Sequence, residues 1–246
     1  MNLILIGGNG LLGSYYLQKF IKKRYNVIVL DINNSNIKKF KNYKFIKCDV
    51  SNSIELRKKI QYTIKLLKKV DVLINNAAFT SELALKNNIK FDNDNLDLWQ
   101  KNLDVNLTSQ FISCNEVIKN MINYKSGKII NVSSLYGHIS PNHNLYINED
   151  FFTLAAYTAS KAGVIGLTKW LASKYAGDGI VINSISPGGV FNFQSDTFVN
   201  KYESLNPSKK MANPEDIYKV ISFLISNKSN YVIGQNLKVD GGHSIW

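Results

Sequence analysis

Residues 2–13, NLILIGGNGLLG, decide the fold, because an apolar run here leads directly into a glycine-rich turn. The run Asn2–Ile6 predicts a short buried strand. A helical pattern follows over Leu11–Arg24, and a second apolar run, Asn26–Leu30, ends at Asp31. This order of strand, glycines, helix, strand and acid predicts a βαβ unit.

The glycine turn predicts a site for the diphosphate of a dinucleotide. Glycines let the backbone approach phosphate oxygens closely, and the amides at a helix N-terminus bind them. An acid after the second strand, as Asp31 is, can accept both ribose hydroxyls and would repel a 2′-phosphate. The sequence therefore predicts a preference for NAD over NADP. The residues of the turn that we expect to bind the cofactor are Gly7, Asn9, Gly10, Leu11, Leu12 and Gly13.

Strands and helices alternate along the rest of the chain. Further strands are expected over 43–47, 72–74, 128–132, 180–185 and 236–239, and helices over 52–68 (with Ser51 as N-cap), 94–123, 155–176 and 214–226. The segment 190–212 is polar and predicts no regular structure. Such alternation predicts a parallel sheet covered on both faces. We therefore expect one α/β domain over residues 1–246, with a Rossmann-type doubly wound sheet of about seven strands.

Length and composition are those of a folded globular chain. The 246 residues are 45% hydrophobic and 11% aromatic, which is enough for a substantial core. The net charge of +12 raises the question of nucleic acid binding. The lysines are scattered, however, and the longest basic run is Lys22-Lys23-Arg24, so we expect no nucleic acid partner and rather an attraction for an anionic substrate.

No targeting, membrane or metal motif is evident. The first residues lack the basic start and long apolar core of a signal peptide. No apolar run is long enough to cross a bilayer, and Cys48 and Cys114 form no metal or redox motif. The sequence therefore predicts a cytoplasmic protein without a membrane partner or a metal.

The stretch Ala155–Gly163, AAYTASKAG, sets Tyr157 and Lys161 four residues apart. On a helix these two positions share one face. A lysine cation at about 4 Å would stabilise a phenolate by up to about 4 kcal/mol at an effective dielectric near 20. This would bring the pKa of the phenol towards neutrality, where general acid–base catalysis works best. The alternative, in a chain rich in both residue types, is a packed tyrosine beside a solvated lysine.

The order of these motifs resembles the short-chain dehydrogenase/reductase family over nearly the whole chain. The resemblance implies an NAD(P)-dependent oxidoreductase that interconverts a secondary alcohol and a ketone. It is carried by the glycine turn Gly7–Gly13, the segment Asn75-Asn76-Ala77-Ala78, Asn106 within Asp104-Val105-Asn106, Ser134 in NVSS, the pair Tyr157 and Lys161, Pro187-Gly188, and the closing Val239-Asp240-Gly241-Gly242.

The resemblance also implies a role for each of these residues. Tyr157 would exchange a proton with the substrate oxygen, and Lys161 would lower the pKa of the phenol and bind the nicotinamide ribose. Ser134 would donate to the substrate oxygen, where charge changes in the transition state. Asn106 would hold a water that links Lys161 to bulk solvent. Further cofactor contacts implied by the resemblance are Asp49 and Val50 at the adenine, Asn76, Ala77 and Ala78 at the adenosine ribose, and Pro187, Gly188 and Val190 at the nicotinamide.

Three features depart from the usual pattern of the family. The glycines follow G-x-x-G-x-x-G, and Ala78 stands where a glycine is usual. Ser134 and Tyr157 are also separated by about ten more residues than the family norm, with the extra length in His138–Phe152. This insertion would lie over the active site and shape the choice of substrate.

The insertion, together with SPGGVFNFQ and KKMANPEDI, resembles oxidoreductases of bacterial flagellin-modification and surface-sugar pathways. This resemblance implies a phosphorylated or nucleotide-linked sugar as the substrate. Its phosphate would then meet Lys201, Lys209 and Lys210. The alternative is that these are solvated lysines of a lysine-rich chain.

Two alternatives remain open on the sequence alone. The same fold supports reduction of a carrier-bound 3-oxoacyl thioester, against which Asp31 argues because reductive biosynthesis usually draws on NADPH. A non-catalytic nucleotide-sensing protein is the other alternative, although such proteins commonly lose the Tyr157 and Lys161 pair. Since the family usually assembles through its long helices, we expect 94–123 and 155–176 to form a homodimer or homotetramer.

Overall fold

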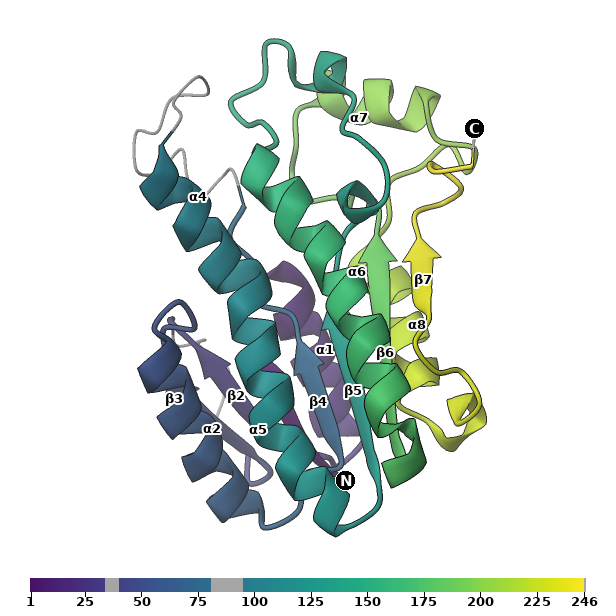
Figure 1. Ribbon diagram of the computed structural model, residues 1–246. Coiled ribbons are helices and arrows are strands. Elements are labelled where there is room, and N and C mark those ends of the chain that lie inside the picture. The colour runs from purple at the N-terminus through teal and green to yellow at the C-terminus, as the bar shows by residue number, and fades with distance from the viewer. Residues whose placement is uncertain (34–39, 81–94, 246) are drawn as a thin grey trace.

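The computed structural model describes residues 1–33, 40–80 and 95–245. Over these ranges the chain forms a parallel sheet of seven strands in the order β3-β2-β1-β4-β5-β6-β7 (Figure 1). The predicted α/β fold is confirmed, and each predicted strand is present. The strands are β1 (Asn2–Ile6), β2 (Asn26–Asp31), β3 (Tyr43–Lys47), β4 (Val72–Asn75), β5 (Gly127–Val132), β6 (Ile180–Pro187) and β7 (Asn236–Val239).

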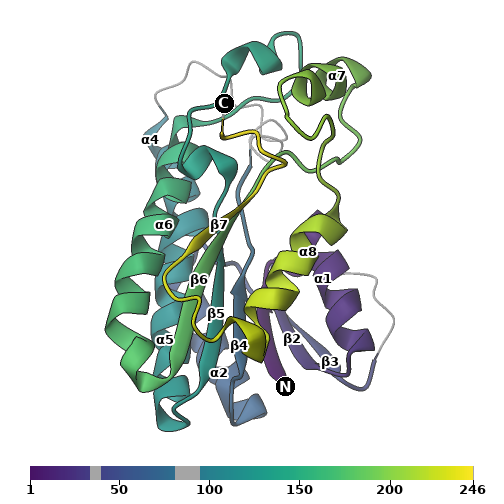
Figure 2. The same cartoon turned by 90° about the vertical axis from the view of Figure 1, so that its right-hand side faces the viewer.

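Helices cover both faces of the sheet. They are α1 (Leu11–Lys22), α2 (Ser53–Leu67), α4 (Leu96–Leu103), α5 (Ser109–Asn123), α6 (Ala155–Tyr175), α7 (Asp196–Ser204) and α8 (Pro214–Leu224). Figure 2 shows α5 and α6 in one layer and α1 with α8 on the opposite side of the strands. None of the helices within the described ranges is long and apolar enough to cross a bilayer.

Side chains that alternate along each strand contribute to two hydrophobic cores, one on each face of the sheet. In β1, Ile4 and Ile6 join the cluster that packs under α2, α5 and α6, whereas Leu3 and Leu5 join the cluster under α1 and α8. Successive side chains of a strand point to opposite faces. A strand that is apolar at every position is therefore buried on both sides, as parallel strands are.

The helix predicted over 94–123 is interrupted, and residue 94 lies outside the described ranges. Between α4 and α5 the segment Asp104–Thr108 adopts π-helical geometry. Asn106 lies in this segment, fully buried, and its Oδ1 accepts the amide of Phe79 at 2.7 Å. A π turn often marks a functional site. Here it presents the Asn106 amide group to the loop that follows β4.

Two local predictions were wrong. Asn52, and not Ser51, is the N-cap of α2, since its side chain accepts the amide of Glu55 at 3.0 Å. The hydroxyl of Ser51 instead donates to Asp49 at 2.7 Å. The segment predicted to be irregular contains α7. This helix is short, and only Phe198 and Tyr202 of its nine residues are buried, so the sequence shows little apolar periodicity there.

Candidate active site

A cavity of about 720 Å³ lies at the carboxyl edge of the sheet. It is lined by residues that follow β1, β4, β5 and β6, and it crosses the boundary between β1 and β4, where the strand order reverses direction. Ligands of open parallel sheets bind at such a boundary. The volume is within the range of small-molecule and cofactor sites.

Nearly all of the predicted site residues line this cavity. They are Gly7, Asn9, Gly10, Leu11, Leu12, Asp31, Asp49, Val50, Asn76, Ala77, Ala78, Ser134, Tyr157, Lys161, Pro187, Gly188 and Val190. Gly13 and Asn106 do not line it. A Cβ atom on Gly13 would lie 2.1 Å from the carbonyl oxygen of Gly7. Gly13 therefore lets α1 pack against the turn, and the structure gives it no direct place in the cavity.

Sequence reasoning missed part of the lining. The additional residues are Leu30, Ile32, Asn33, Cys48, Phe79, Thr80, Lys101, Val105, Val132, Ser133, Asn192 and Gln194. Those within two positions of a predicted residue could have been found by extending each motif by one or two positions. Lys101 and Gln194 carry no such signal, because only the folded chain brings them to this edge.

The glycine turn forms a cradle that fits a diphosphate. Gly7 has a φ of +78°, and a Cβ atom on it would lie 2.4 Å from the backbone of Ala77. A Cβ on Gly10 would meet open space. Gly10 caps α1 without a side-chain hydrogen bond, and the first turn of α1 carries no acidic residue. The free amides at this helix start are therefore suited to phosphate oxygens.

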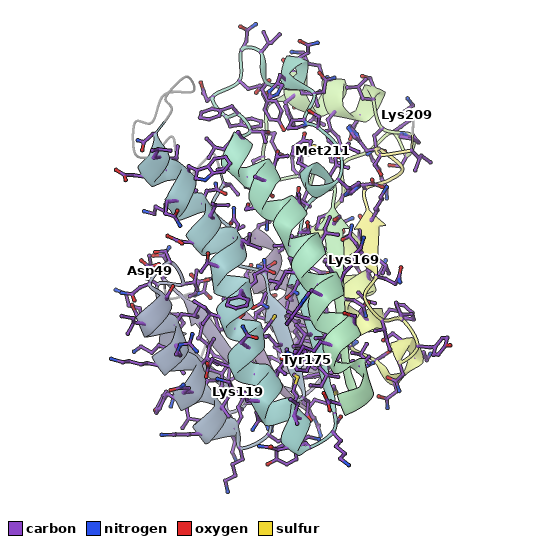
Figure 3. All side chains as sticks on the ribbon, viewed as in Figure 1. Asp49, Lys119, Lys169, Tyr175, Lys209 and Met211 are labelled. Carbon is purple, nitrogen blue, oxygen red and sulfur yellow. The ribbon has the colours of Figure 1, made fainter. Side chains whose placement is uncertain are left out.

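Asp31 lies at the end of β2 with its carboxylate held by the backbone. Its two oxygens accept the amide of Asn9 at 2.9 Å and the amide of Asn33 at 3.1 Å. A carboxylate has about four acceptor sites, so capacity remains for a ribose diol. Asp49, labelled in Figure 3, lines the same part of the cavity and accepts the amide of Ser51 at 2.9 Å. Two carboxylates here suit an adenosine without a 2′-phosphate.

Tyr157, Lys161 and Ser134 meet where the cavity reaches β5. Tyr157 and Lys161 lie one turn apart on α6, with the Nζ atom of Lys161 5.5 Å from the centre of the Tyr157 ring. The hydroxyl of Ser134 forms a hydrogen bond with the Tyr157 phenol. Ser133 donates to the carbonyl of Lys161 at 2.7 Å and so holds α6 against β5. This arrangement favours Ser134 over Ser133 as the donor to a substrate.

Burial sets the charge of the Tyr157 and Lys161 pair. It lowers the pKa of Lys161 to about 7. It also raises the pKa of Tyr157, which the hydrogen bond with Ser134 opposes. The expectation that Lys161 lowers the pKa of the phenol is therefore not met in this structure. The phenol is protonated at neutral pH and can donate to a carbonyl oxygen, while the lysine can gain or lose a proton.

Asn106 does not line the larger cavity but holds the backbone of Phe79, which does. Its Nδ2 donates to the carbonyl of Phe79 at 3.2 Å and to Oδ1 of Asn102 at 2.7 Å. Its backbone carbonyl accepts from Gln110 at 3.1 Å, and the same Gln110 amide group donates to the carbonyl of Val132 at 3.4 Å. Lys161 donates to that Val132 carbonyl at 2.9 Å. Asn106 is thus linked to Lys161 through protein groups, and the water predicted between them stays a prediction.

A second cavity of about 230 Å³ opens beside Tyr157 and Ser134. It is lined by Thr80, Ser134, Leu135, Tyr136, Tyr146, Phe151, Phe152, Thr153, Leu154, Tyr157, Pro187, Gly188, Gly189, Gln194, Phe198, Tyr202 and Met211. Six of these residues also line the larger cavity, so the two are continuous. Since Tyr146, Phe151 and Phe152 belong to the insertion, its predicted place over the site is confirmed. Figure 1 shows α7 at the same end of the molecule, beyond the carboxyl ends of the strands.

The three lysines proposed to meet a phosphate lie elsewhere. Lys201, Lys209 and Lys210 line neither cavity. The Nζ atom of Lys209 donates to the carbonyl of Ser204 at 2.9 Å. Figure 3 shows Lys209 towards the edge of the molecule, whereas Met211 lies nearer its middle. The geometry gives no support to a phosphate contact by these lysines.

A parallel sheet with a dinucleotide cradle at its switch point, and a tyrosine, lysine and serine converging beside it, defines a nucleotide-dependent oxidoreductase of the Rossmann type. Comparison with known proteins agrees. A family model described as enoyl-(acyl carrier protein) reductase matches residues 12–244. The chain belongs to the short-chain dehydrogenase/reductase family and is an NAD(P)-dependent enzyme of that family. The alternative of a non-catalytic sensing protein is therefore set aside.

Relatives in sequence and structure are similar over most of their length. The 3-oxoacyl-[acyl-carrier-protein] reductase FabG of Buchnera aphidicola is 37% identical over 201 residues, which cover 80% of this chain and 76% of that protein. The enzyme of the same name from Rickettsia bellii is 31% identical over 248 residues, covering 97% and 95%. The short chain dehydrogenase from Leptospira borgpetersenii with bound NAD+ is 30% identical, with a TM-score of 0.89 and coverage of 99% and 92%. The complex of 4-hydroxyisoleucine dehydrogenase with NADH is also 30% identical, with a TM-score of 0.84 and coverage of 100% and 99%.

Proposed function

We propose that the protein transfers a hydride reversibly between NAD(H) and a carbon that carries a secondary alcohol or a ketone. The observation that carries this proposal is the convergence of Tyr157, Ser134 and Lys161 at the point where the dinucleotide cavity meets the smaller one. The nicotinamide, when bound, supplies the hydride chemistry. The residues of the chain manage the proton and the developing charge.

In the direction of reduction, the Tyr157 phenol donates its proton to the substrate oxygen. The hydroxyl of Ser134 donates a hydrogen bond to the same oxygen, where negative charge grows in the transition state. Lys161, with its pKa lowered to about 7 by burial, can restore the proton to the phenol near neutral pH. Its ammonium would also bind the hydroxyls of the nicotinamide ribose. In the direction of oxidation these proton movements are reversed.

The cofactor proposed is NAD(H) in preference to NADP(H). Asp31 and Asp49 place negative charge at the end of the cavity where a 2′-phosphate would lie. Two structures similar to this one contain NAD+ or NADH. These observations support the preference, and replacement of Asp31 with alanine tests it.

For the substrate we propose a 3-oxoacyl thioester or a closely related 3-oxo compound. The relatives named 3-oxoacyl-[acyl-carrier-protein] reductase support this alternative better than the sugar predicted from the insertion. The rings of Phe151, Phe198 and Tyr202 give the smaller cavity apolar walls, which suit an acyl chain. Within the described ranges, that cavity has no lysine or arginine in its lining, although a phosphosugar would need one.

A polyhydroxylated compound is the second candidate. The side chains of Tyr136, Tyr146 and Gln194 bring polar groups into the same cavity as the apolar rings. Hydroxyl and amide groups at fixed positions are what a sugar ring requires for recognition. This observation, rather than the three surface lysines, keeps a neutral sugar unit among the substrates to be tested.

The test follows NADH absorbance with acetoacetyl thioesters in reduction and, in parallel, with neutral sugars, phosphosugars and nucleotide sugars in both directions. We expect turnover of the thioesters. Replacing Tyr157 with phenylalanine should lower kcat by at least about 100-fold, since it removes the general acid, and should leave the affinity for NADH within about twofold. Turnover that survives this change would contradict the role of Tyr157. Turnover of sugars without turnover of thioesters would establish the second candidate instead.

A further inference from the structure

Two tyrosine hydroxyls form a hydrogen-bonded pair in the lining of the smaller cavity. The Oη atoms of Tyr136 and Tyr146 lie 2.7 Å apart. Both residues line the cavity together with Ser134 and Tyr157. Tyr136 lies in a short helical turn that starts directly after Ser134, whereas Tyr146 comes from the insertion. The pair therefore joins the strand-end serine motif to the segment that distinguishes this chain from the family norm.

Packing holds both residues in place. The Tyr146 ring lies 5.7 Å from the ring of Phe151 and 5.8 Å from the ring of Phe198. The backbone of Tyr136 donates to the hydroxyl of Ser134 at 3.2 Å. A fixed polar group among apolar walls discriminates strongly between substrates, because an analogue that lacks the matching oxygen leaves the group unpaired.

The pair of Tyr136 and Tyr146 has one hydroxyl proton that is not used in the bond between them. Each phenol has one O–H donor, and one of the two protons is used in the bond between the tyrosines. The Tyr146 hydroxyl also forms a hydrogen bond with the side chain of Thr153, and because this bond lowers the pKa of Tyr146, Thr153 is its donor. One phenol proton is therefore left. Burial raises the pKa of both Tyr136 and Tyr146 and keeps the phenols neutral. Both also interact electrostatically with Tyr157, the group that would touch the reacting oxygen. A donor is therefore available close to the site of the chemistry.

We propose that Tyr136 and Tyr146 determine specificity by binding a second oxygen of the substrate, one close along its chain to the carbon that receives the hydride. This inference rests on the proposed function. In a 3-oxoacyl thioester the second oxygen is that of the thioester carbonyl. In a sugar it is the hydroxyl on the neighbouring carbon. The shared chemistry is an oxygen that accepts a hydrogen bond near the reacting carbonyl.

The first experiment compares ethyl 3-oxobutanoate with heptan-2-one, which are chains of equal length that end in a methyl ketone. Only the first carries a second carbonyl. Tyr136→Phe and Tyr146→Phe keep both rings and remove one hydroxyl each. For ethyl 3-oxobutanoate we expect kcat/KM with NADH to fall about 10-fold in either variant, and for heptan-2-one to stay within about twofold. Tyr231→Phe, at a fully exposed tyrosine, is the matched control and should change neither.

Equal losses for the two ketones would show that the hydroxyls only hold the insertion in place, and unchanged values for both would show that they do not contact the substrate. Either result overturns the inference. A parallel arm compares oxidation of glucose and 2-deoxyglucose with NAD+. A loss in the variants for glucose alone would identify a sugar hydroxyl, and not an ester carbonyl, as the second oxygen.

Binding without turnover separates this inference from the proposed function. Because NAD+ cannot reduce a ketone, calorimetry can measure the affinity of each ketone for the enzyme saturated with NAD+. We expect ethyl 3-oxobutanoate to bind more tightly than heptan-2-one, and this difference to shrink about 10-fold in both variants. If the wild type reduces neither ketone but shows this pattern, the proposed reaction fails and the inference stands. If the wild type binds the two ketones equally, the inference is overturned.

Discussion

Lys161 is only 1% exposed, and its Nζ atom donates to the carbonyl of Val132 at 2.9 Å. Desolvation disfavours a charged lysine, and here it lowers the pKa to about 7. In the unfolded chain the pKa returns to about 10.4. The native protein therefore binds fewer protons than the unfolded chain between these two values, and keeping this lysine at the site costs stability.

Replacement of Lys161 with methionine should remove this pH dependence. The destabilisation by Lys161 is fully present below about pH 7 and disappears as the pH approaches 10.4, so stability rises with pH in that window. We expect the wild type to gain about 3 kcal/mol relative to the variant between pH 7 and pH 9.5. Urea unfolding of the cofactor-free protein at both pH values measures the difference. A difference that does not change with pH would contradict the lowered pKa.

Replacement of Asp31 with alanine should weaken NADH much more than NADPH. The carboxylate is expected to accept hydrogen bonds from the ribose diol, and a charged hydrogen bond contributes about 1.5–3 kcal/mol. We expect Kd for NADH to rise about 10-fold or more and Kd for NADPH to change by less than about threefold. Titrations followed by nicotinamide fluorescence give both constants. Asp178→Ala, at an exposed carboxylate that lines neither cavity, is the control. Equal weakening of both cofactors would remove the basis for the NAD preference.

Single residues were predictable where the backbone itself fixes their place. Gly7, Asp31 and Ser134 lie at the carboxyl ends of strands or within two residues of them, and in a parallel sheet these ends meet at one edge. The partnership of Tyr136 with Tyr146 could not be predicted, because it depends on how an insertion folds back over the sheet. The raised pKa of Tyr157 was also missed, since desolvation is a property of the packed site and not of the spacing to Lys161.

At the scale of elements, one serine connects the insertion to α7. The Oγ atom of Ser195 accepts the amide of Phe198 at 3.0 Å and so caps α7. The same hydroxyl donates to the carboxylate of Glu149 in the insertion, at 2.9 and 2.8 Å to its two oxygens. Tyr146 of the insertion and Phe198 of α7 both line the smaller cavity. The connection through Ser195 therefore fixes the position of the insertion relative to α7.

Replacement of Ser195 with alanine should cost about 1 kcal/mol through the lost cap, which lowers Tm by roughly 2–4 °C. It should also raise KM for the substrate more than it lowers kcat, because α7 carries part of the cavity wall. Scanning calorimetry and steady-state kinetics measure both. Glu149→Gln retains the cap of α7 and should lose less than half as much stability. An equal loss in the two variants would place the effect in the connection and not in the cap.

Element boundaries were predictable where periodicity and caps agree. The strands and α6 match their predicted ranges closely. Short apolar runs are typical of the buried strands of a parallel sheet, so their ends can be read from the sequence. The interruption at Asp104–Thr108 was not predictable, since the apolar pattern continues through it and the buried hydrogen bond of Asn106 with Phe79 forms only in the folded chain. In α7 the short length and polar surface conceal the helix.

At the scale of the whole molecule, α5 and α6 form an outer layer of the structure (Figure 1). Along α6, Ala162, Gly166 and Trp170 follow at intervals of four residues and are exposed, Trp170 by 55%. Phe111 on α5 is exposed by 47%. Apolar surface gathered on one pair of helices is typical of an interaction site. It supports the predicted homodimer or homotetramer, which stays a prediction, as does the cytoplasmic location.

Replacement of Gly166 with glutamate tests this face without harming the fold. A Cβ atom on Gly166 would meet no atom within 4 Å, so the side chain has room in the single chain. Glutamate is also a better helix former than glycine, by up to about 1 kcal/mol, so the helix itself should not suffer. In an interface formed by this face, however, the new carboxylate would be buried without a partner, and this costs several kcal/mol. We expect the wild type to sediment as a dimer or tetramer at about 10 μM and the variant as a smaller species, since a few kcal/mol shift a dissociation constant more than 100-fold.

Gly177 provides the matched control for this substitution. It lies just beyond the end of α6, and a Cβ atom on it would likewise meet no atom within 4 Å. Gly177→Glu adds the same charge and volume and should leave the sedimentation coefficient of the wild type unchanged. A monomeric wild type would contradict the assembly, and an unchanged Gly166→Glu variant would move the interface away from α6. Because α6 is expected to tolerate the change, a smaller species for Gly166→Glu alone would be attributed to the lost interface and not to unfolding.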